Sequence, residues 1–129
     1  DLSHYNSCNV LSLHALLGAY SDEGAQWLDE LRPVLADNIR YACDFIAAHF
    51  PGVQVMQPQG TYMLFLDCAA WLQEHHMTLR ELEERGARAG VIWQDGAAFA
   101  WPDSIRMNLA LPHSRLVEAM ERLRKYAFC

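Results

Sequence analysis

The sequence predicts an α+β fold, a two-layer sandwich in which helices cover a small mixed or antiparallel sheet. Three observations lead to this prediction. Apolar residues recur at steps of three and four in several segments, as they do along one buried side of a helix. Short runs of β-forming residues lie between turn signals. The 129 residues, of which 52% are hydrophobic, are enough to enclose one core.

Two helices are expected first. Residues 9–20 form a helix that is apolar on more than one side, as in helices with several neighbours. A long helix should then run from about residue 23 to residue 49. Its buried stripe recurs at helical spacing and consists of Leu28, Leu31, Leu35, Ile39, Ala42 and Ile46. Pro33 should either kink this helix or mark a first turn after a break a few residues earlier. Pro51-Gly52 ends it.

A pair of strands should follow the long helix. Val53 and Val55 alternate with polar residues in a short first strand. Pro58-Gln59-Gly60 signals a turn. Residues 61–66 then form a strong strand that is apolar on both faces and rich in β-forming residues. Such a strand is expected to be covered on both sides.

A helical segment is expected after these strands. Residues 69–75 form a short helix. Thr78 and Glu81 have the spacing of a capping box, in which each satisfies a free amide at a helix start. The helix that they open should run to about Ala89, and Gly90 should close it.

Two more strands and a last helix complete the predicted order. Residues 91–93 form a short strand, residues 95–99 a loop, and residues 104–109 a second strand. Pro112 and Ser114 open the final helix. Its buried stripe consists of Leu116, Met120, Leu123 and Ala127.

The strand at residues 104–109 carries the most informative side chains. Because side chains alternate along a strand, Ile105 and Met107 can face the core while Arg106 and Asn108 point together to the other side. An arginine on a rigid strand beside a cleft is suited to two-point binding of a carboxylate, and a neighbouring asparagine can steady it or add a donor. An arginine on a strand can also be a surface residue or an ion-pair partner, so the chemistry alone leaves this choice open.

Two glycine-containing segments, residues 58–62 and 95–99, are further candidate sites. In each of them a glycine can let the backbone approach another group closely, although ordinary turn chemistry explains the same residues. The sequence contains no GxGxxG and no GxxxxGK[ST] pattern, so a phosphate cradle is not expected within it.

Composition and charge exclude several other classes of function. The net charge of −6 argues against a nucleic-acid partner, which favours a basic face. No apolar run approaches the length of a membrane span, and the first residues do not resemble a signal peptide. These features favour a cytoplasmic protein. The cysteines lack CxxC spacing and are expected to be reduced thiols; they are Cys8, Cys43, Cys68 and Cys129.

Neither a metal site nor a catalytic nucleophile is expected from the residue pattern. The six histidines show no HExxH spacing, and His75 and His76 are adjacent, so on a helix they would point in different directions. No serine has the G-x-S-x-G setting. The only lysine is Lys125, which is expected on the solvent side of the last helix.

Five segments taken together carry a family resemblance. In chain order they are NVLSLHALLGAY, WLDELRPVLADN, VQVMQPQGTYMLFLDC, GVIWQDGAAF and SIRMNLALP. Their order and spacing resemble the last third of fold-type I enzymes that use pyridoxal phosphate (PLP), in the class I/II aminotransferase family. P-x-G-T-Y, and D-G-x-x-F followed by R-x-N-L-A, are similar to the branch of cystathionine β-lyases and C–S lyases. The resemblance covers nearly the whole chain.

This resemblance implies a domain organisation. Residues 23–129 would be the carboxy-terminal small domain of a PLP enzyme, with the sandwich of the aminotransferase small-domain type. Residues 1–22 would contain a helix that packs on a large domain, which is missing from this sequence. The chain starts without a methionine in a loop-like segment. We therefore expect it to be a fragment of a longer enzyme.

The resemblance also implies a function and a site. The full-length protein would be a PLP-dependent C–S β-lyase, such as a cystathionine β-lyase, or an aminotransferase. Arg106 looks like the arginine that binds the substrate α-carboxylate, with Asn108 beside it. Tyr62 and Gly60 match the small-domain strand that borders the substrate site, without a firm role. The groups that hold PLP lie in the large domain of such enzymes, so no catalytic, cofactor-binding or metal-binding residue is expected here, and the isolated fragment should be inactive.

The implied partners are an amino-acid substrate, the missing large domain and, for the full-length enzyme, a second copy in a homodimer. The sequence departs from the family pattern after Phe99, where Ala100 is followed by the bulky Trp101. This departure leaves the substrate's size open. The alternative function is a non-catalytic small-molecule or protein-interaction domain with the same fold.

Overall fold

The computed structural model describes residues 9–129, and the predictions for His4 and Cys8 lie outside the described residues. The chain divides into two compact units, Asp1–Val34 and Leu35–Cys129. Each unit is described by itself.

The first unit contains helix α1, Val10–Ala19, and the beginning of helix α2. The side chain of Asn9 caps α1 by accepting a hydrogen bond from the Ser12 amide at 2.8 Å. The expected helix at residues 9–20 is therefore confirmed within a residue at each end. No residue of α1 is buried, and Leu11 is 81% exposed. Nothing within residues 9–129 buries this helix, although apolar helices usually pack against several neighbours.

Helix α2 runs without interruption from Asp22 to His49, and Pro33 lies inside it. A break shortly before Pro33 is therefore wrong. The predicted stripe is buried only toward the carboxyl end of the helix, where Ile39 and Ile46 are 7% and 1% exposed. Leu28, nearer the amino end, is 41% exposed.

The second unit contains a four-stranded sheet in which every pair of neighbours is antiparallel. The spatial order is β1-β2-β4-β3. The strands are β1 Gln54–Val55, β2 Met63–Asp67, β3 Gln94–Asp95 and β4 Ser104–Asn108. The α+β prediction is confirmed, and of its two alternatives the antiparallel sheet is the correct one.

Two predicted strands are displaced, each for a local reason. The strand expected at residues 61–66 starts at Met63 because Thr61 has a φ of 68°, which no extended strand allows. The strand expected at residues 91–93 is wrong, and pairing with β4 begins at Gln94 instead. The apolar residues before Gln94 are held elsewhere: the Val91 amide bonds to the Gly86 carbonyl, and the Trp93 ring occupies the space beside Gly86.

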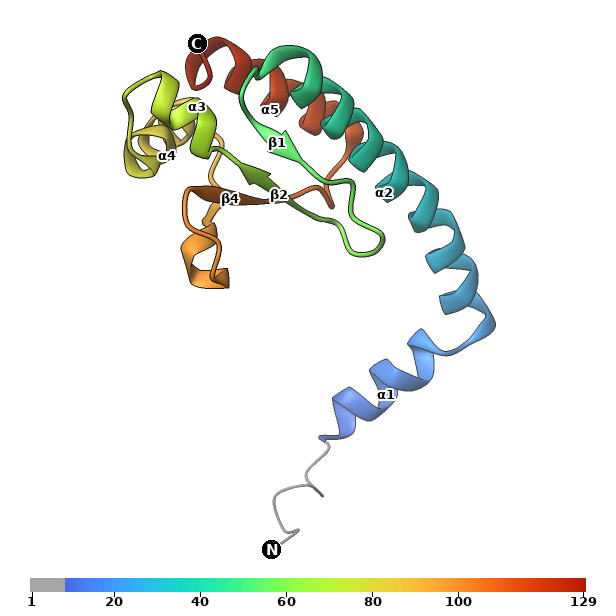
Figure 1. The fold of residues 1–129 in the computed structure, drawn as a ribbon. Coiled ribbons are helices and arrows are strands. Elements are labelled where there is room, and N and C mark those ends of the chain that lie inside the picture. Colours follow the sequence, from blue (N-terminus) through green and yellow to red (C-terminus); the bar gives the residue numbers. More distant parts are fainter. Residues whose placement is uncertain (1–8) are drawn as a thin grey trace, which may run out of the picture. The chain divides into compact units, whose positions relative to one another are not determined.

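Helices cover one face of this sheet, as Figure 1 shows for α2 and α5. The remaining elements are α3 Ala69–Glu74, α4 Leu79–Arg88, the 3₁₀ helix η1 Gly96–Phe99 and α5 His113–Tyr126. The capping box of Thr78 and Glu81 at the start of α4 is confirmed. The predicted stripe of α5 is buried, and it packs with Leu64, Leu66, Ile105 and Met107 of the sheet in one core.

Asn38 of α2 is a fully buried polar residue that ties the helix to the end of β4. Its side-chain amide donates to the carbonyl oxygens of Leu109 and Leu111, both at 2.9 Å. Its Oδ1 lies 2.9 Å from Nδ1 of His113. All three contacts lie within the second unit. They fix the connection between β4 and α5, and so the position of the strand that carries Arg106.

Candidate functional site

Arg106 stands in the middle of a row of three residues that crosses the sheet. It is paired with Phe65 of β2 on one side and with Gln94 of β3 on the other. On β4 its neighbours Ile105 and Met107 point into the core and are 0% and 4% exposed. Arg106 therefore points away from the core, as its strand position predicts.

Two groups hold the Arg106 side chain. Nη1 donates a hydrogen bond to Oε1 of Gln94 at 2.6 Å. The central guanidinium carbon lies 4.5 Å from the centre of the Phe99 ring, which is a cation–π distance. The guanidinium thus has one neutral hydrogen-bond acceptor and one aromatic face beside it.

The neutral partner sets Arg106 apart from most arginines in the chain. Of the nine arginines, all of them within the described residues, seven lie within 4.0 Å of a carboxylate: Arg32, Arg40, Arg80, Arg88, Arg115, Arg122 and Arg124. Arg85 donates to a backbone carbonyl. Arg106 is the one whose side-chain partner is an amide. Its positive charge is held in place without being neutralised.

An aromatic cluster of Phe65, Phe99 and Trp101 lies next to this charge. The Phe65 ring meets the Phe99 ring edge to face, with centres 5.7 Å apart and planes at 82°. The Trp101 ring stacks on Phe65 at 5.7 Å and 13°. Offset and edge-to-face pairs of this kind stabilise one another beyond the area that they bury. The cluster places apolar rings beside Arg106, one from β2 and two from the segment between β3 and β4.

A shallow hollow of about 390 Å³ opens beside Arg106. Its lining residues are Tyr62, Met63, Ile92, Trp93, Gln94, Arg106 and Asn108. Arg106 is the only charged residue among them. Three of the four predicted site residues, Arg106, Asn108 and Tyr62, are therefore brought together around one hollow.

The three predicted site residues other than Arg106 differ in their contacts. Asn108 does not hold Arg106, because its Oδ1 accepts from the Ala110 amide at 2.8 Å and Gln94 makes the bond to the guanidinium instead. Tyr62 is 43% exposed, and its carbonyl accepts from the Leu109 amide. Gly60 does not line the hollow, and a side chain there would meet open space. The left-handed backbone expected of a turn glycine lies at Thr61 instead.

The second glycine segment does make a close approach, to its own chain. A Cβ added at Gly96 would overlap Oγ of Ser104 and lie 2.7 Å from the carbonyl oxygen of Trp101. Ser104 in turn donates to that carbonyl at 2.7 Å. Ala100 closes η1 with a φ of 60°, a conformation that glycine adopts more readily. These contacts fix the loop that presents Phe99.

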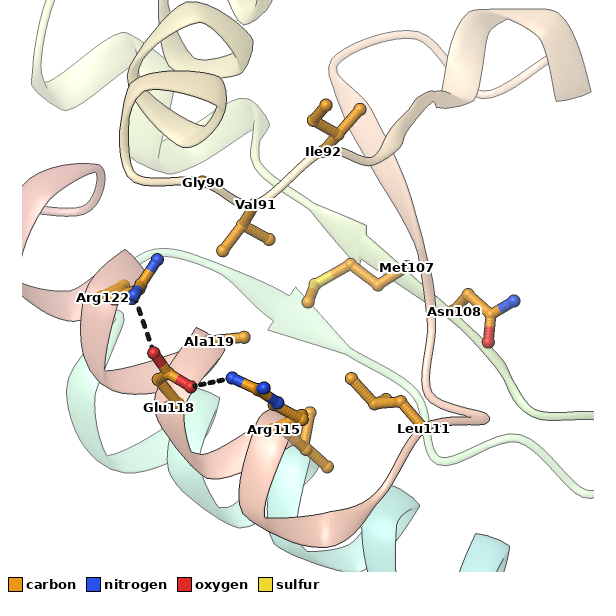
Figure 2. A pocket seen from close by; sticks show the side chains of 11 residues that line it. Gly90, Val91, Ile92, Met107, Asn108, Leu111, Arg115, Glu118, Ala119 and Arg122 are labelled. Atoms are coloured by element: carbon orange, nitrogen blue, oxygen red, sulfur yellow. Dashed lines mark hydrogen bonds and ion pairs between the residues drawn. The ribbon is translucent and has the colours of Figure 1, made fainter.

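A second hollow, of about 410 Å³, runs along α5 and is a weaker candidate (Figure 2). It contains Arg115 and Arg122, and Figure 2 shows both side chains turned toward Glu118 between them. Their ion pairs measure 3.0 Å and 2.7 Å. Hydrogen bonding from Arg115 and the charge of Arg122 hold the pKa of Glu118 below its usual value. Both cations are therefore already paired with a carboxylate of the protein.

Other chemistry finds little support among residues 9–129. No group of three His, Cys, Asp or Glu side chains in this range could hold a metal ion. Burial, with the nearby carboxylates Asp67 and Asp103, raises the pKa of the Cys68 thiol to about 12, so it is a poor nucleophile. Cys43 and Cys129 are also free thiols. None of the helices in this range is long and apolar enough to cross a bilayer.

Two residues of the site were not identified from the sequence: Gln94 and Trp93. Gln94 was missed because the strand was placed three residues too early, which hid its pairing with Arg106. The D-G-x-x-F segment did point to Phe99, although not to its ring contact with the arginine. No sequence pattern identified Trp93 as a site residue. Its buried indole nitrogen has no hydrogen-bond partner in the described part of the chain.

Comparison with known proteins gives the family. The profile of the family described as aminotransferase class I and II matches residues 2–123. Protein MalY of Escherichia coli is 33% identical over 122 residues, which cover 92% of this chain and 30% of MalY. A cystathionine beta-lyase of Corynebacterium glutamicum is 35% identical over 118 residues, 89% of this chain and 30% of that protein. The chain thus spans about a third of the length of these relatives.

Solved structures agree with the sequence comparison. Cystalysin from Treponema denticola, whose crystal structure contains pyridoxal 5′-phosphate, matches with a TM-score of 0.78 and 28% identity over 91% of this chain and 29% of its own. A PLP-bound C-S lyase from Staphylococcus hominis, complexed with L-cycloserine, matches with a TM-score of 0.82 and 25% identity over 95% of this chain and 32% of its own. The relatives described above include a cystathionine beta-lyase and a C-S lyase. The chain therefore belongs to the class I and II aminotransferase family.

Proposed function

We propose that this chain supplies Arg106 as the group that binds the substrate α-carboxylate in a PLP-dependent amino-acid enzyme, either a C–S β-lyase or an aminotransferase. The observation that carries the proposal is the un-neutralised guanidinium in the open hollow. Charge-assisted, two-point hydrogen bonds make an arginine the preferred partner of a carboxylate. Asn108 and Tyr62 line the same hollow and border the substrate. Gly60 enters the proposal only through its place in the turn before Tyr62.

In the proposed mechanism the chain's own residues bind and orient the substrate. Arg106 fixes the carboxylate, and the Phe99 ring covers one face of the guanidinium. Holding one end of a substrate in a fixed geometry lowers the entropic part of the barrier for the reaction at its other end. This orientation serves a lyase and an aminotransferase equally.

The residues present do not fit a PLP site of their own. PLP enzymes bind the cofactor through a lysine. The only lysine here is Lys125, which is exposed on α5 with its ammonium 5.0 Å from the centre of the Tyr126 ring. We therefore assign PLP binding to the part of the full-length enzyme outside these residues, and we expect the isolated chain to be inactive.

The domain organisation belongs to the same proposal. Residues 23–129 form the small domain, and the helix within residues 1–22 packs on the large domain. The exposed apolar side chains of α1 support this packing: Val10, Leu11, Leu13, Leu16 and Leu17 are each 49% exposed or more. A cytoplasmic homodimer is the expected state of the full-length enzyme.

The test is replacement of Arg106 by alanine in the full-length enzyme. With L-cystathionine as substrate, kcat/KM should fall about 100-fold, because the loss of a charged hydrogen-bonding pair costs about 3 kcal/mol. The matched control is Arg115→Ala, which removes an arginine already paired with Glu118 and should leave kcat/KM within about twofold. An Arg106→Ala enzyme with unchanged kcat/KM would exclude the carboxylate role.

The alternative function is a non-catalytic binding domain. The coding sequence upstream of this chain distinguishes it from the enzyme. A large α/β domain with a PLP-binding lysine there agrees with the enzyme. An unrelated domain or a stop codon there would favour the alternative, and binding of an amino acid by the isolated chain would support it.

A further inference from the structure

We infer that Gln94 and Phe99 are positioning residues that hold the Arg106 guanidinium in its binding orientation without neutralising it. The inference rests on the proposed function for its catalytic consequence. Its physical part, that these two residues order the arginine, can be tested independently.

Gln94 restrains one edge of the guanidinium. As the cross-strand partner of Arg106 it lies directly opposite on β3, and its Oε1 accepts from Nη1 at 2.6 Å. An amide oxygen can accept this hydrogen bond but carries no net charge. A glutamate at the same position would form an ion pair with Arg106 and would compete with any carboxylate ligand. The neutral residue thus restrains the arginine and keeps its charge available.

Phe99 restrains one face of the guanidinium. Its ring centre lies 4.5 Å from Cζ, and the ring is itself held edge-on by Phe65, on which Trp101 stacks. The loop beneath is fixed because Gly96 packs against Ser104 with no room for a side chain. The position of the ring is therefore set by the sheet and by the loop together.

These two restraints leave an open side on the arginine. An arginine has five N–H donors in a planar fork. Among residues 9–129, only the bond to Gln94 engages any of these donors, and Arg106 lines the hollow. A flexible arginine loses side-chain entropy when it binds a ligand. Ordering Arg106 in advance lowers that cost, which predicts an effect on KM more than on kcat.

The first experiment measures order in the 129-residue chain by nuclear magnetic resonance. In the wild type, the heteronuclear NOE of the Arg106 Nε–H should be clearly higher than that of Arg80, whose side chain is 87% exposed. In Gln94→Leu and in Phe99→Leu, the Arg106 value should drop to the Arg80 level, while Phe99→Tyr, which keeps an aromatic face, should retain it. If Arg106 keeps its NOE in both leucine variants, the inference is wrong.

The second experiment uses the full-length enzyme with L-cystathionine. Gln94→Glu should raise KM about tenfold and change kcat less than twofold, because the new carboxylate competes with that of the substrate. Gln73→Glu on α3 introduces the same charge at an exposed site and should change neither constant. Equal kinetics in the two glutamate variants would overturn the catalytic part of the inference.

The two proposals fail in distinguishable ways. If Arg106→Ala leaves kcat/KM unchanged while the leucine variants still release the side chain, the carboxylate role is wrong and the ordering of Arg106 stands. If Arg106→Ala reduces kcat/KM but Gln94→Glu behaves like Gln73→Glu, the carboxylate role stands and the positioning role of Gln94 is wrong.

Discussion

The two faces of the sheet differ in what their side chains do, although the same strands build both. On the helix-covered face, Leu64, Leu66 and Ile105 are at most 1% exposed and belong to one apolar core. On the opposite face, Arg106 is half-buried beside Phe65 and faces a hollow. Alternation along a strand therefore separates the apolar core from the proposed binding face by a single residue step.

The difference shows how an arginine that we propose to bind a ligand can be kept on a rigid support. The covered face fixes the backbone of β2 and β4 by burying apolar area. The open face can then carry a charge that contributes little to stability, because the strand beneath it is already held. This comparison makes quantitative predictions for the free energy of unfolding of the 129-residue chain.

The largest effect is expected on the covered face. Leu66→Ala should lower the free energy of unfolding by about 3 kcal/mol, because it removes buried methyl groups and leaves a cavity in a core where Leu66 is fully buried. Urea unfolding followed by circular dichroism measures the change. Met63→Ala, on the half-buried open face of the same strand, should cost clearly less. Equal costs for the two variants would contradict the separation of the faces.

The next largest effect on the free energy of unfolding is expected at Asn38, whose hydrogen bonds connect α2 to the end of β4. Asn38→Ala should cost about 2 kcal/mol, since it removes two buried or part-buried side-chain hydrogen bonds. The Leu109 carbonyl then keeps only the Leu111 amide as its donor, and the part-buried Leu111 carbonyl loses its Asn38 donor. The control is Asn108→Ala, an exposed asparagine with one local bond to Ala110, which should cost about 0.5 kcal/mol. Both values come from the same urea titration. A cost for Asn38→Ala no larger than the control would show that these hydrogen bonds do not fix β4.

Local signals made much of this fold predictable from the sequence. The capping box of Thr78 and Glu81 and the stripe of α5 depend on residues close in sequence, and both were identified correctly. The outward direction of Arg106 followed from strand alternation. These features need no knowledge of the rest of the chain.

Long-range contacts account for what was missed. Asn38 is a polar residue on a helix, and its partners lie 71 and 73 residues away, so no local pattern identifies it. The strand expected at residues 91–93 moved to Gln94 because Trp93 packs beside Gly86 of α4. The partner of Arg106 depended on that register. Sequence periodicity therefore predicted the direction of the Arg106 side chain but not the residues that contact it.

A smaller effect is expected at the edge of the covered face, where α4 begins. Thr78→Ala should cost about 1 kcal/mol, because it removes the side-chain acceptor for the Glu81 amide. The reciprocal bonds from Thr78 hold the pKa of Glu81 below its usual 4.5. A lowered folded-state pKa contributes stability that is present above about pH 4.5 and is lost as pH falls through the folded value. Thr78→Ala keeps the backbone bond to the Glu81 carboxylate, the larger cause of the lowered pKa, and removes only the hydroxyl bond. The penalty in urea titrations should therefore shrink in part between pH 7 and pH 3. A constant penalty would show that the hydroxyl bond to the carboxylate adds no stability.

The smallest effect is expected at Arg106 itself. Arg106→Gln should change the free energy of unfolding by no more than about 0.5 kcal/mol, because its bond to Gln94 is exposed and its ring contact is solvated. Urea unfolding beside the Leu66→Ala variant gives the comparison directly. A cost near 2 kcal/mol would mean that Arg106 is a structural residue whose donors serve the fold. A cost near zero, together with the loss of kcat/KM expected for Arg106→Ala, would mean that the sheet holds this charge for a ligand, since the fold itself gains almost nothing from it.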